Sequence, residues 1–269
     1  MISRVSRHMY EEPAICGERG AGTVFFSGCN LGCVFCQNSV ISRKSVGKEF
    51  DERELAELFL TVASSGVSSL DLVTPTHFTP TVAAALALVK DKLSIPVVWN
   101  SGGYESIVSL ALLRGLVDVY LPDFKYYSSE ISAKYSHAAD YRERAEEALS
   151  FMYDMLGAAD IDNDGMMKKG IIVRHLVLPG HRSDSIAALR RLAEIIPAAD
   201  VRLSLMSQYT PDFYHGEHKN LLRRVTTFEY ESVLREAINL GFDGYMQSPS
   251  SASAKYTPDF SATFSIDLS

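Results

Sequence analysis

Short apolar runs alternate with amphipathic stretches along most of the chain. Seven of these runs predict buried strands, because they are rich in β-branched, leucine and aromatic residues and are bounded by turn residues. The predicted strands are Thr23–Ser27, Ser69–Val73, Ile95–Asn100, Val117–Leu121, Gly170–Val177, Val201–Met206 and a short run at Gly244–Gln247. Strands that are apolar on both faces are typical of a parallel sheet covered on both sides.

Helical patterns lie between the strands. Asp51 with Glu54 is an acidic helix start, and Thr226 with Glu229 forms a capping box, with Gly241 at the end of that helix. The other predicted helices are Thr81–Lys92, Glu105–Leu113, Tyr141–Leu156 and Asp184–Ile196. These repeats predict an α/β fold with a mostly parallel sheet covered by helices. Six strand–helix units are too few for the closed eight-stranded barrel.

The composition narrows the class of protein. The 269 residues are 46% hydrophobic and 22% charged, which suits one globular domain with a sizeable core. The core is expected at about residues 20–247, with the N-terminal segment and the tail from Ser248 packed on it. The net charge of −7 and the lack of a basic run argue against nucleic acid as the main partner. No signal peptide or membrane span is recognisable, so a cytoplasmic protein without a membrane partner is expected.

Three cysteines carry the strongest chemical signal. Cys29, Cys33 and Cys36 have C-x3-C-x2-C spacing and directly follow the predicted strand Thr23–Ser27. Three thiolates can hold three corners of an iron–sulfur cube and leave the fourth iron without a protein ligand. An open metal position can bind a substrate, as it does in catalytic zinc sites.

Zinc and disulfide alternatives fit these cysteines less well. A zinc site needs a second ligand pair, and the only other cysteine, Cys16, has no C-x2-C or H-x3-H partner pair. Structural disulfides are rare in the expected compartment. Cys16 is therefore expected to be a packing cysteine.

The segment Gly28–Asn38, which reads GCNLGCVFCQN, resembles the cluster motif of radical S-adenosylmethionine (radical SAM) enzymes. More narrowly, the chain is similar to the branch that contains pyruvate formate-lyase activating enzyme and its PflX-type relatives. The segments that carry this narrower resemblance are Glu11–Pro13, Gly20–Gly28, Leu72–Phe78 and Arg174–Gly180.

The resemblance implies a six-stranded partial barrel that is open along one side. It implies that Cys29, Cys33 and Cys36 bind a [4Fe-4S] cluster, whose open iron is chelated by SAM. Phe35 matches the aromatic residue that the family has before its last cysteine, and Phe35 and Asn38 are both expected beside the cofactor. It also implies an electron donor such as flavodoxin or ferredoxin.

Two predicted strands end in residues that are candidates for SAM binding, since loops after parallel strands converge on one face. Thr74, Thr76 and His77 stand where most radical SAM enzymes have a Gly-Gly-Glu-type turn that holds the SAM amino group. Thr74 and Thr76 are assigned to the cofactor, with a purely turn-shaping role as the alternative, and His77 is ambiguous. Asn100 and Gly102 are assigned to the ribose part of SAM, and the alternative is that they only form a glycine turn at the start of a helix.

The next two strands supply charged candidates. Asp123 and Lys125 match an Asp-x-Lys of glycyl-radical activating enzymes, and a surface ion pair is the alternative. Arg174 stands in an apolar strand, where a guanidinium needs an anion. That anion is either the SAM carboxylate or a buried acid such as Asp123.

The predicted function is that of a radical SAM oxidoreductase. It cleaves SAM to a 5′-deoxyadenosyl radical that abstracts hydrogen, and the resemblance implies that this step activates a glycyl radical enzyme. The alternatives are the radical SAM modification of another peptide or small molecule, and a non-catalytic iron–sulfur redox protein.

Overall fold

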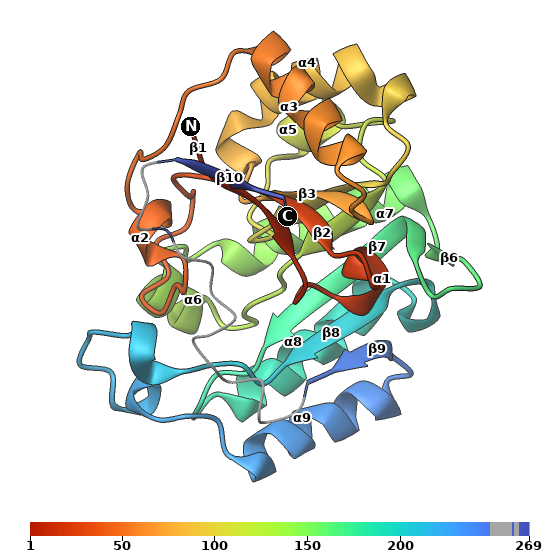
Figure 1. The fold of residues 1–269 in the computed structure, drawn as a ribbon. Helices are drawn as coiled ribbons and strands as arrows, with labels where there is room; N and C mark the ends of the chain where they lie inside the picture. Colours follow the sequence, from red (N-terminus) through yellow and green to blue (C-terminus); the bar gives the residue numbers. More distant parts are fainter. Residues whose placement is uncertain (248–259, 261–263, 269) are drawn as a thin grey trace.

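In the computed structural model, which describes residues 1–247, 260 and 264–268, one mostly parallel sheet forms the centre of the molecule (Figure 1). Its strand order is β10-β1-β2-β3-β4-β5-β7-β8-β9. The strands are β1 Ile2–His8, β2 Ala21–Phe26, β3 Ser69–Val73, β4 Val97–Ser101, β5 Val119–Pro122, β6 Asp160–Ile161, β7 Met167–Leu176, β8 Arg202–Met206, β9 Asp243–Met246 and β10 Ser265–Asp267. All seven predicted strands are present, as β2–β5 and β7–β9.

Helices surround this sheet (Figure 1). They are α1 Pro13–Cys16, α2 Ser39–Ser42, α3 Glu52–Ser64, α4 Thr79–Val89, α5 Ile107–Ala111, α6 Ser129–Ser136, α7 Tyr141–Leu156, α8 Arg182–Ile195 and α9 Thr227–Asn239. The capping boxes predicted at Asp51 and at Thr226 are both formed. The α/β class, with helices around a mostly parallel sheet, is therefore confirmed. No helix among the described residues combines the length and apolar character that a membrane span needs.

The sheet is not closed within the part of the chain that the structure describes. Its path ends at β9 on one side and at β10 on the other, as in a partial barrel open along one side. The N-terminal strand β1, which the sequence did not predict, pairs antiparallel with β2 and parallel with β10. The C-terminal tail was expected to pack over the barrel, but most of it lies outside the described residues.

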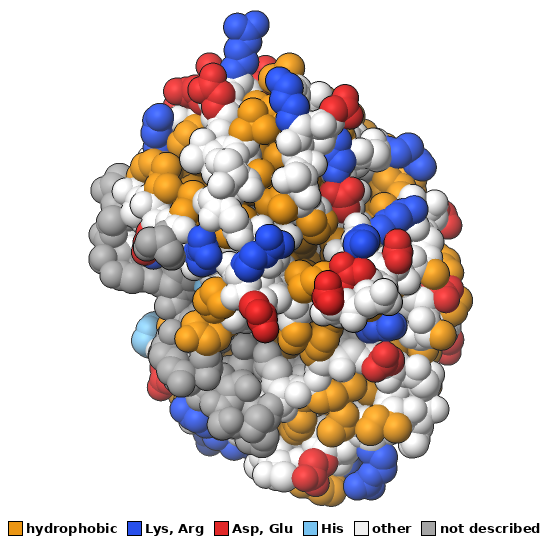
Figure 2. All heavy atoms as spheres, turned by 45° about the vertical axis from the view of Figure 1, so that its right-hand side comes forward, with side chains coloured by type: hydrophobic (Ala, Val, Ile, Leu, Met, Phe, Trp, Pro, Cys, Tyr) orange, Lys and Arg blue, Asp and Glu red, His pale blue; other side chains and the backbone are white. Residues whose placement is uncertain are grey.

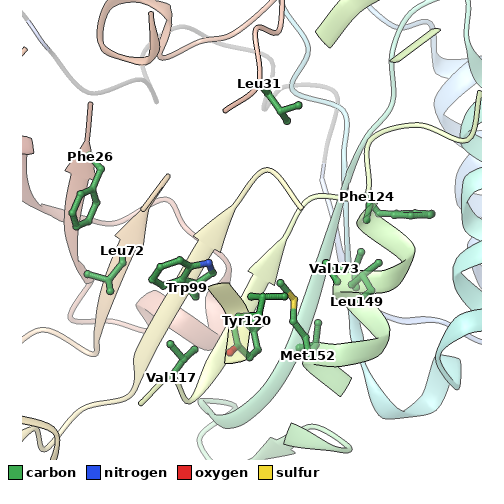
Figure 3. Packing of buried hydrophobic residues seen from close by; sticks show 14 of the residues in the cluster. Phe26, Leu31, Leu72, Trp99, Val117, Tyr120, Phe124, Leu149, Met152 and Val173 are labelled. Atoms are coloured by element: carbon green, nitrogen blue, oxygen red, sulfur yellow. The ribbon is translucent and has the colours of Figure 1, made fainter. Parts of the chain in front are cut away.

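The main core lies between the sheet and the helices. Trp99 and Tyr120, on neighbouring strands, face the same layer as Leu149 and Met152 of α7 (Figure 3). All four side chains are fully buried or nearly so. The predicted helix Glu105–Leu113 is shorter than expected, because Glu105 turns inward and accepts hydrogen bonds from Trp99 Nε1 (3.1 Å) and Thr76 Oγ1 (2.8 Å).

A second apolar cluster lies where the strands begin. It joins α1 to several strands, and its members include Ile15, Cys16, Val98, Val119 and Ile172. In Figure 1, α1 lies at one end of the strands, and α2 and α6 lie at the other. The cysteine loop follows the end of β2, so it lies at the end opposite to α1. Charged side chains of both signs are interspersed on the face shown in Figure 2.

Candidate functional site

The cysteine loop, residues 29–36, connects the end of β2 to α2. Gly28 directly precedes this loop, and its φ of 84° lies in the region that favours glycine. A Cβ at this position would lie 2.8 Å from Nε2 of His77. The same ring nitrogen lies 2.8 Å from the carbonyl oxygen of Ser27. His77, ambiguous in the sequence, is thus packed against the start of the loop.

Helix α6, which lies about a hundred residues further along the chain, holds the middle of this loop. The amide of Gly32 donates to the carbonyl of Ser136 (3.3 Å), and the amide of Val34 donates to that of Tyr135 (2.8 Å). Residues at the end of α6 therefore hold the loop that carries the three thiols.

Each of the three thiols has a hydrogen-bond partner. Cys29 Sγ accepts from the amide of Leu31 (3.4 Å), and Cys36 Sγ accepts from the hydroxyl of Ser42 (3.5 Å). Cys33 Sγ lies 2.9 Å from Ser136 Oγ. Donors directed at sulfur stabilise thiolate ligands and tune the metal centres that they bind. The donor set of this loop therefore fits an iron–sulfur cluster.

Burial keeps two of these thiols protonated when no metal is bound. It raises the pKa of Cys29 to about 11 and also raises the pKa of Cys33. A metal ligand must be deprotonated, so cluster binding would release these protons. Among the described residues, no group of three His, Cys, Asp or Glu side chains converges to hold a single metal ion. A cube, by contrast, offers each thiolate a different iron.

The thiols line a cavity of about 250 Å³ inside the barrel. Of the residues assigned to the cofactor from the sequence, those that line this cavity are Phe35, Asn38, Thr74, Asn100, Gly102, Asp123, Lys125 and Arg174. The strand ends therefore do converge with the cysteine loop. Phe35 also makes an edge-to-face contact with Tyr209, with ring centroids 6.0 Å apart.

The two threonines after β3 have different surroundings. Thr74 has a φ of 58°, unusual for a β-branched residue, and its amide donates to the carbonyl of Asn100 (2.8 Å). Thr76 is not among the cavity-lining residues, and its hydroxyl donates to Glu105 Oε1. Thr74 therefore faces the cavity, whereas Thr76 supports the turn from behind.

A chain of polar contacts crosses the barrel interior, and we call its members Asp71, Asn100, Asp123 and Arg174 the polar belt. Arg174 donates from Nε to Asp123 Oδ1 (2.9 Å) and from Nη2 to Asn100 Oδ1 (2.6 Å). Asn100 Nδ2 donates to Asp71 Oδ2 (3.4 Å). Arg174 therefore contacts Asp123, which is one of the two anions considered for it from the sequence.

Asp123 also pairs with Lys125. Burial alone would raise the pKa of Asp123, but Arg174 and Lys125 lower it below its usual value. Burial alone would lower the pKa of Lys125, but Asp123 raises it. Both groups are therefore charged at neutral pH, and the ammonium of Lys125 is held at the cavity wall.

Gly102 and Gly103 allow close approach of the backbone at the end of β4. A Cβ on Gly103 would lie 2.0 Å from the carbonyl oxygen of Asp123, and this distance is too short for any side chain at position 103. A Cβ on Gly102 would lie 2.9 Å from Leu31 of the cysteine loop. The glycine pair thus lets the strand ends and the loop meet.

The sequence did not assign any role to the N-terminal residues that line the cavity, which are His8, Tyr10, Glu11 and Glu12. They follow β1 and precede α1, so they reach the barrel interior from the end opposite to the cysteines. The sequence offered one signal for such a role: two adjacent acids, Glu11 and Glu12, stand before Pro13 and the apolar run Ala14–Cys16. Cys16 is buried, as expected, and its Sγ lies 3.3 Å from the carbonyl oxygen of Glu11, away from the cysteine loop.

Comparison with known proteins agrees with the geometry of the loop. Residues 16–120, which include all three clustered cysteines, match the model of a family described as a 4Fe-4S single cluster domain. Over 232 residues the chain is 29% identical to the uncharacterized protein MJ0674 of Methanocaldococcus jannaschii. The alignment covers 82% of the chain but 63% of that relative.

Two proteins of known structure share the fold at low sequence identity. Methylornithine synthase (PylB) aligns with a TM-score of 0.52 and 17% identity, over 92% of this chain and 70% of that one. SuiB of Streptococcus suis bound to S-adenosylmethionine aligns with a TM-score of 0.55 and 9% identity, over 83% of this chain and 49% of SuiB. SuiB has also been solved with its precursor peptide SuiA, and that structure aligns with a TM-score of 0.58 and 10% identity, over 83% and 47%.

Proposed function

We propose that the chain is a radical SAM enzyme, with a [4Fe-4S] cluster on Cys29, Cys33 and Cys36 and SAM in the adjoining cavity. The observation that carries this proposal is the cysteine loop itself. Its three thiols each have a hydrogen-bond partner and line the same cavity as the strand-end residues. The match to a 4Fe-4S single cluster domain supports the cluster. The likeness to SuiB, which has been solved with SAM, supports the cosubstrate.

When bound, the cluster supplies the electron that cleaves SAM to methionine and a 5′-deoxyadenosyl radical, which takes a hydrogen atom from the substrate. The residues of the chain bind SAM and orient it. The ammonium of Lys125 suits the SAM carboxylate, and Asp123 holds that ammonium in place. Thr74, Asn100 and Gly102 offer hydroxyl, amide and backbone groups to the amino and ribose parts of SAM.

Arg174 serves this site mainly as a positioning residue in our proposal. Its guanidinium already contacts Asp123 and Asn100, so it fixes two groups that face the cofactor. Enclosure within the barrel keeps water away from a reactive radical.

As the target we propose a glycine backbone in a partner protein, as for the PflX-type branch of activating enzymes. The likeness to SuiB, solved with a precursor peptide, supports a peptide-sized substrate. An electron donor such as flavodoxin or ferredoxin would reduce the cluster.

The test is anaerobic reconstitution of the protein with iron and sulfide, followed by reduction with dithionite. A [4Fe-4S] signal in electron paramagnetic resonance and the formation of 5′-deoxyadenosine from SAM are expected. Incubation with a deuterated lysate would then trace deuterium into 5′-deoxyadenosine and reveal the substrate. One zinc per chain without iron uptake would contradict the proposal, and a cluster without SAM cleavage would indicate a redox protein instead.

A further inference from the structure

Among the residues that the structure describes, carboxylates outnumber cations in and beside the cavity. Glu11, Glu12 and Asp71 lie around Arg174, and we call these three the inner acids. Arg174 makes its close contacts with Asp123 and Asn100 and lies 3.8 Å from Glu11 Oε2. Lys125 is paired with Asp123.

Two of the inner acids have oxygens without a partner among the described residues. Glu12 Oε2 and Asp71 Oδ1 are both buried and accept no hydrogen bond. Glu12 is 7% exposed and lines the cavity, while Asp71 is fully buried behind Asn100. A buried oxygen that accepts no hydrogen bond is costly unless a bound group satisfies it.

The charge state of the inner acids agrees with this geometry. Burial raises the pKa of Glu12 to about 7 and raises the pKa of Glu11 and of Asp71. His8, whose Nε2 lies 4.0 Å from Glu11 Oε1, has a pKa lowered by burial and supplies no charge at neutral pH. At neutral pH these acids are therefore largely protonated while no cation lies beside them, and a cation that binds there would favour their carboxylate forms.

The position of the inner acids separates them from the SAM end of the cavity. The cysteines follow β2, whereas Glu11 and Glu12 precede α1 and approach from the opposite end of the strands. Tyr10, which also lines the cavity, packs edge-to-face against His8, with ring centroids 5.8 Å apart.

We propose that Glu11 and Glu12 bind a positively charged organic group of the substrate, an ammonium or a guanidinium. This inference rests on the proposed function, since it assigns the substrate end of the same cavity. Asp71 lies behind Asn100, next to this pair. The substrate class is then an amine, or a peptide with a basic side chain near the reacting carbon.

The test is calorimetric titration of the reconstituted protein at constant ionic strength. The probes are agmatine, its uncharged counterpart N-butylurea, the peptide acetyl-Gly-Arg-Gly-amide and its citrulline analogue. We expect agmatine or the arginine peptide to bind and the two uncharged probes not to bind. Which of the two charged probes binds more tightly distinguishes a free amine from a peptide side chain.

Substitutions test whether Glu11 and Glu12 are responsible for binding of the charged probe. Glu12→Gln should weaken binding of the charged probe about ten- to hundredfold, since one charge-assisted contact is lost. Glu11→Gln/Glu12→Gln should abolish it, and the exposed Glu231→Gln should leave it unchanged. Circular dichroism and iron content verify that each variant is folded.

Three outcomes would overturn the inference. The first is that wild type binds neither charged probe, and the second is that binding is the same in the double variant. The third is that potassium chloride displaces the charged probe at equal concentration, which would indicate a metal-ion site. SAM cleavage by the same samples is scored separately. If cleavage fails while Glu12-dependent binding persists, the proposed function is wrong and the cation site stands; the reverse result removes the cation site alone.

Discussion

Ser136 Oγ lies 2.9 Å from Cys33 Sγ, although 103 positions separate the two residues in the sequence. The same hydroxyl lies 2.7 Å from the hydroxyl of Tyr126, which is fully buried. With Tyr126 as donor to Ser136, the serine proton is directed at the sulfur. The sulfur environment of the cysteine loop thus depends on residues from the middle of the chain.

Ser136→Ala should lower the reduction potential of the reconstituted cluster by about 40 mV, because a hydrogen bond worth about 1 kcal/mol stabilises the more negative reduced state. Redox titration monitored by electron paramagnetic resonance measures this shift. Ser132→Ala, in the same helix but bonded to Ser129, is the matched control and should leave the potential unchanged. An unchanged potential in Ser136→Ala would mean that the contact does not persist in the holoprotein.

Replacement of Cys29, Cys33 or Cys36 by alanine should each abolish cluster binding, because every corner of the site rests on one thiolate. Cys16→Ala should keep it, since Cys16 is buried beside Glu11 in the cluster around α1. Iron and sulfide analysis after reconstitution measures the cluster content of each of these variants. Loss of iron from Cys16→Ala in a folded protein would contradict the assignment.

Thr74→Gly should raise the melting temperature by about 2–4 °C, because it removes roughly 1 kcal/mol of strain at a positive φ. It should also weaken SAM binding, because the hydroxyl is lost. Thr74→Ala separates the two effects. Alanine keeps the strain and lacks the hydroxyl, so it should weaken SAM binding without the gain in stability.

Arg174→Met should destabilise the fold by about 3–5 kcal/mol, because it leaves Asp123 buried with only Lys125 as partner. We expect SAM affinity to change less than tenfold, since the guanidinium is already engaged. Thermal unfolding and SAM titration measure the two quantities. A loss of affinity of about ten- to hundredfold would instead assign Arg174 to direct SAM binding. The exposed Arg190→Met is the surface control.

Glu229 gives the fold a pH-dependent contribution. Arg223, the amide of Gly180 and Thr226 all donate to its carboxylate, and they lower its pKa well below the usual value of 4.5. A lowered pKa in the folded state adds stability above the unfolded pKa and loses it as pH falls below that value. Glu229→Gln should therefore lower the melting temperature at pH 7, and the difference from wild type should shrink as pH falls below about 4.5. Exposed Glu231→Gln should show no such trend.

Local patterns predicted most of the barrel. Ser69–Val73 and Tyr141–Leu156 have the predicted bounds, because buried parallel strands and long amphipathic helices carry strong signals. Strand β1 was missed because Arg4 and Arg7 interrupt its apolar pattern, although it pairs along its length with β2. Helix α6 was missed because its sequence, SEISAKYS, is polar and short.

The sequence predicted the part of the candidate site that the residues at the strand ends form. Thr74, Asn100, Asp123 and Lys125 all reach the cavity because the carboxyl ends of parallel strands converge. Glu11 and Glu12 were not assigned, because their approach from the other end of the barrel depends on the antiparallel pairing of β1. From the sequence, two anions were candidates for the partner of Arg174. The contact with Asp123 depends on the register between β5 and β7, which the sequence does not give.

The dependence of the cysteine loop on α6 has a consequence during synthesis. The loop leaves the ribosome early, but the carbonyls of Tyr135 and Ser136 that hold Gly32 and Val34 emerge about a hundred residues later. Domains fold as units while the chain is made. Until α6 has been translated, the three thiols therefore lack the support that sets their spacing, and cluster delivery is best timed after that point. A ribosome-bound chain that ends before residue 129 would expose reactive thiols without the geometry to retain iron.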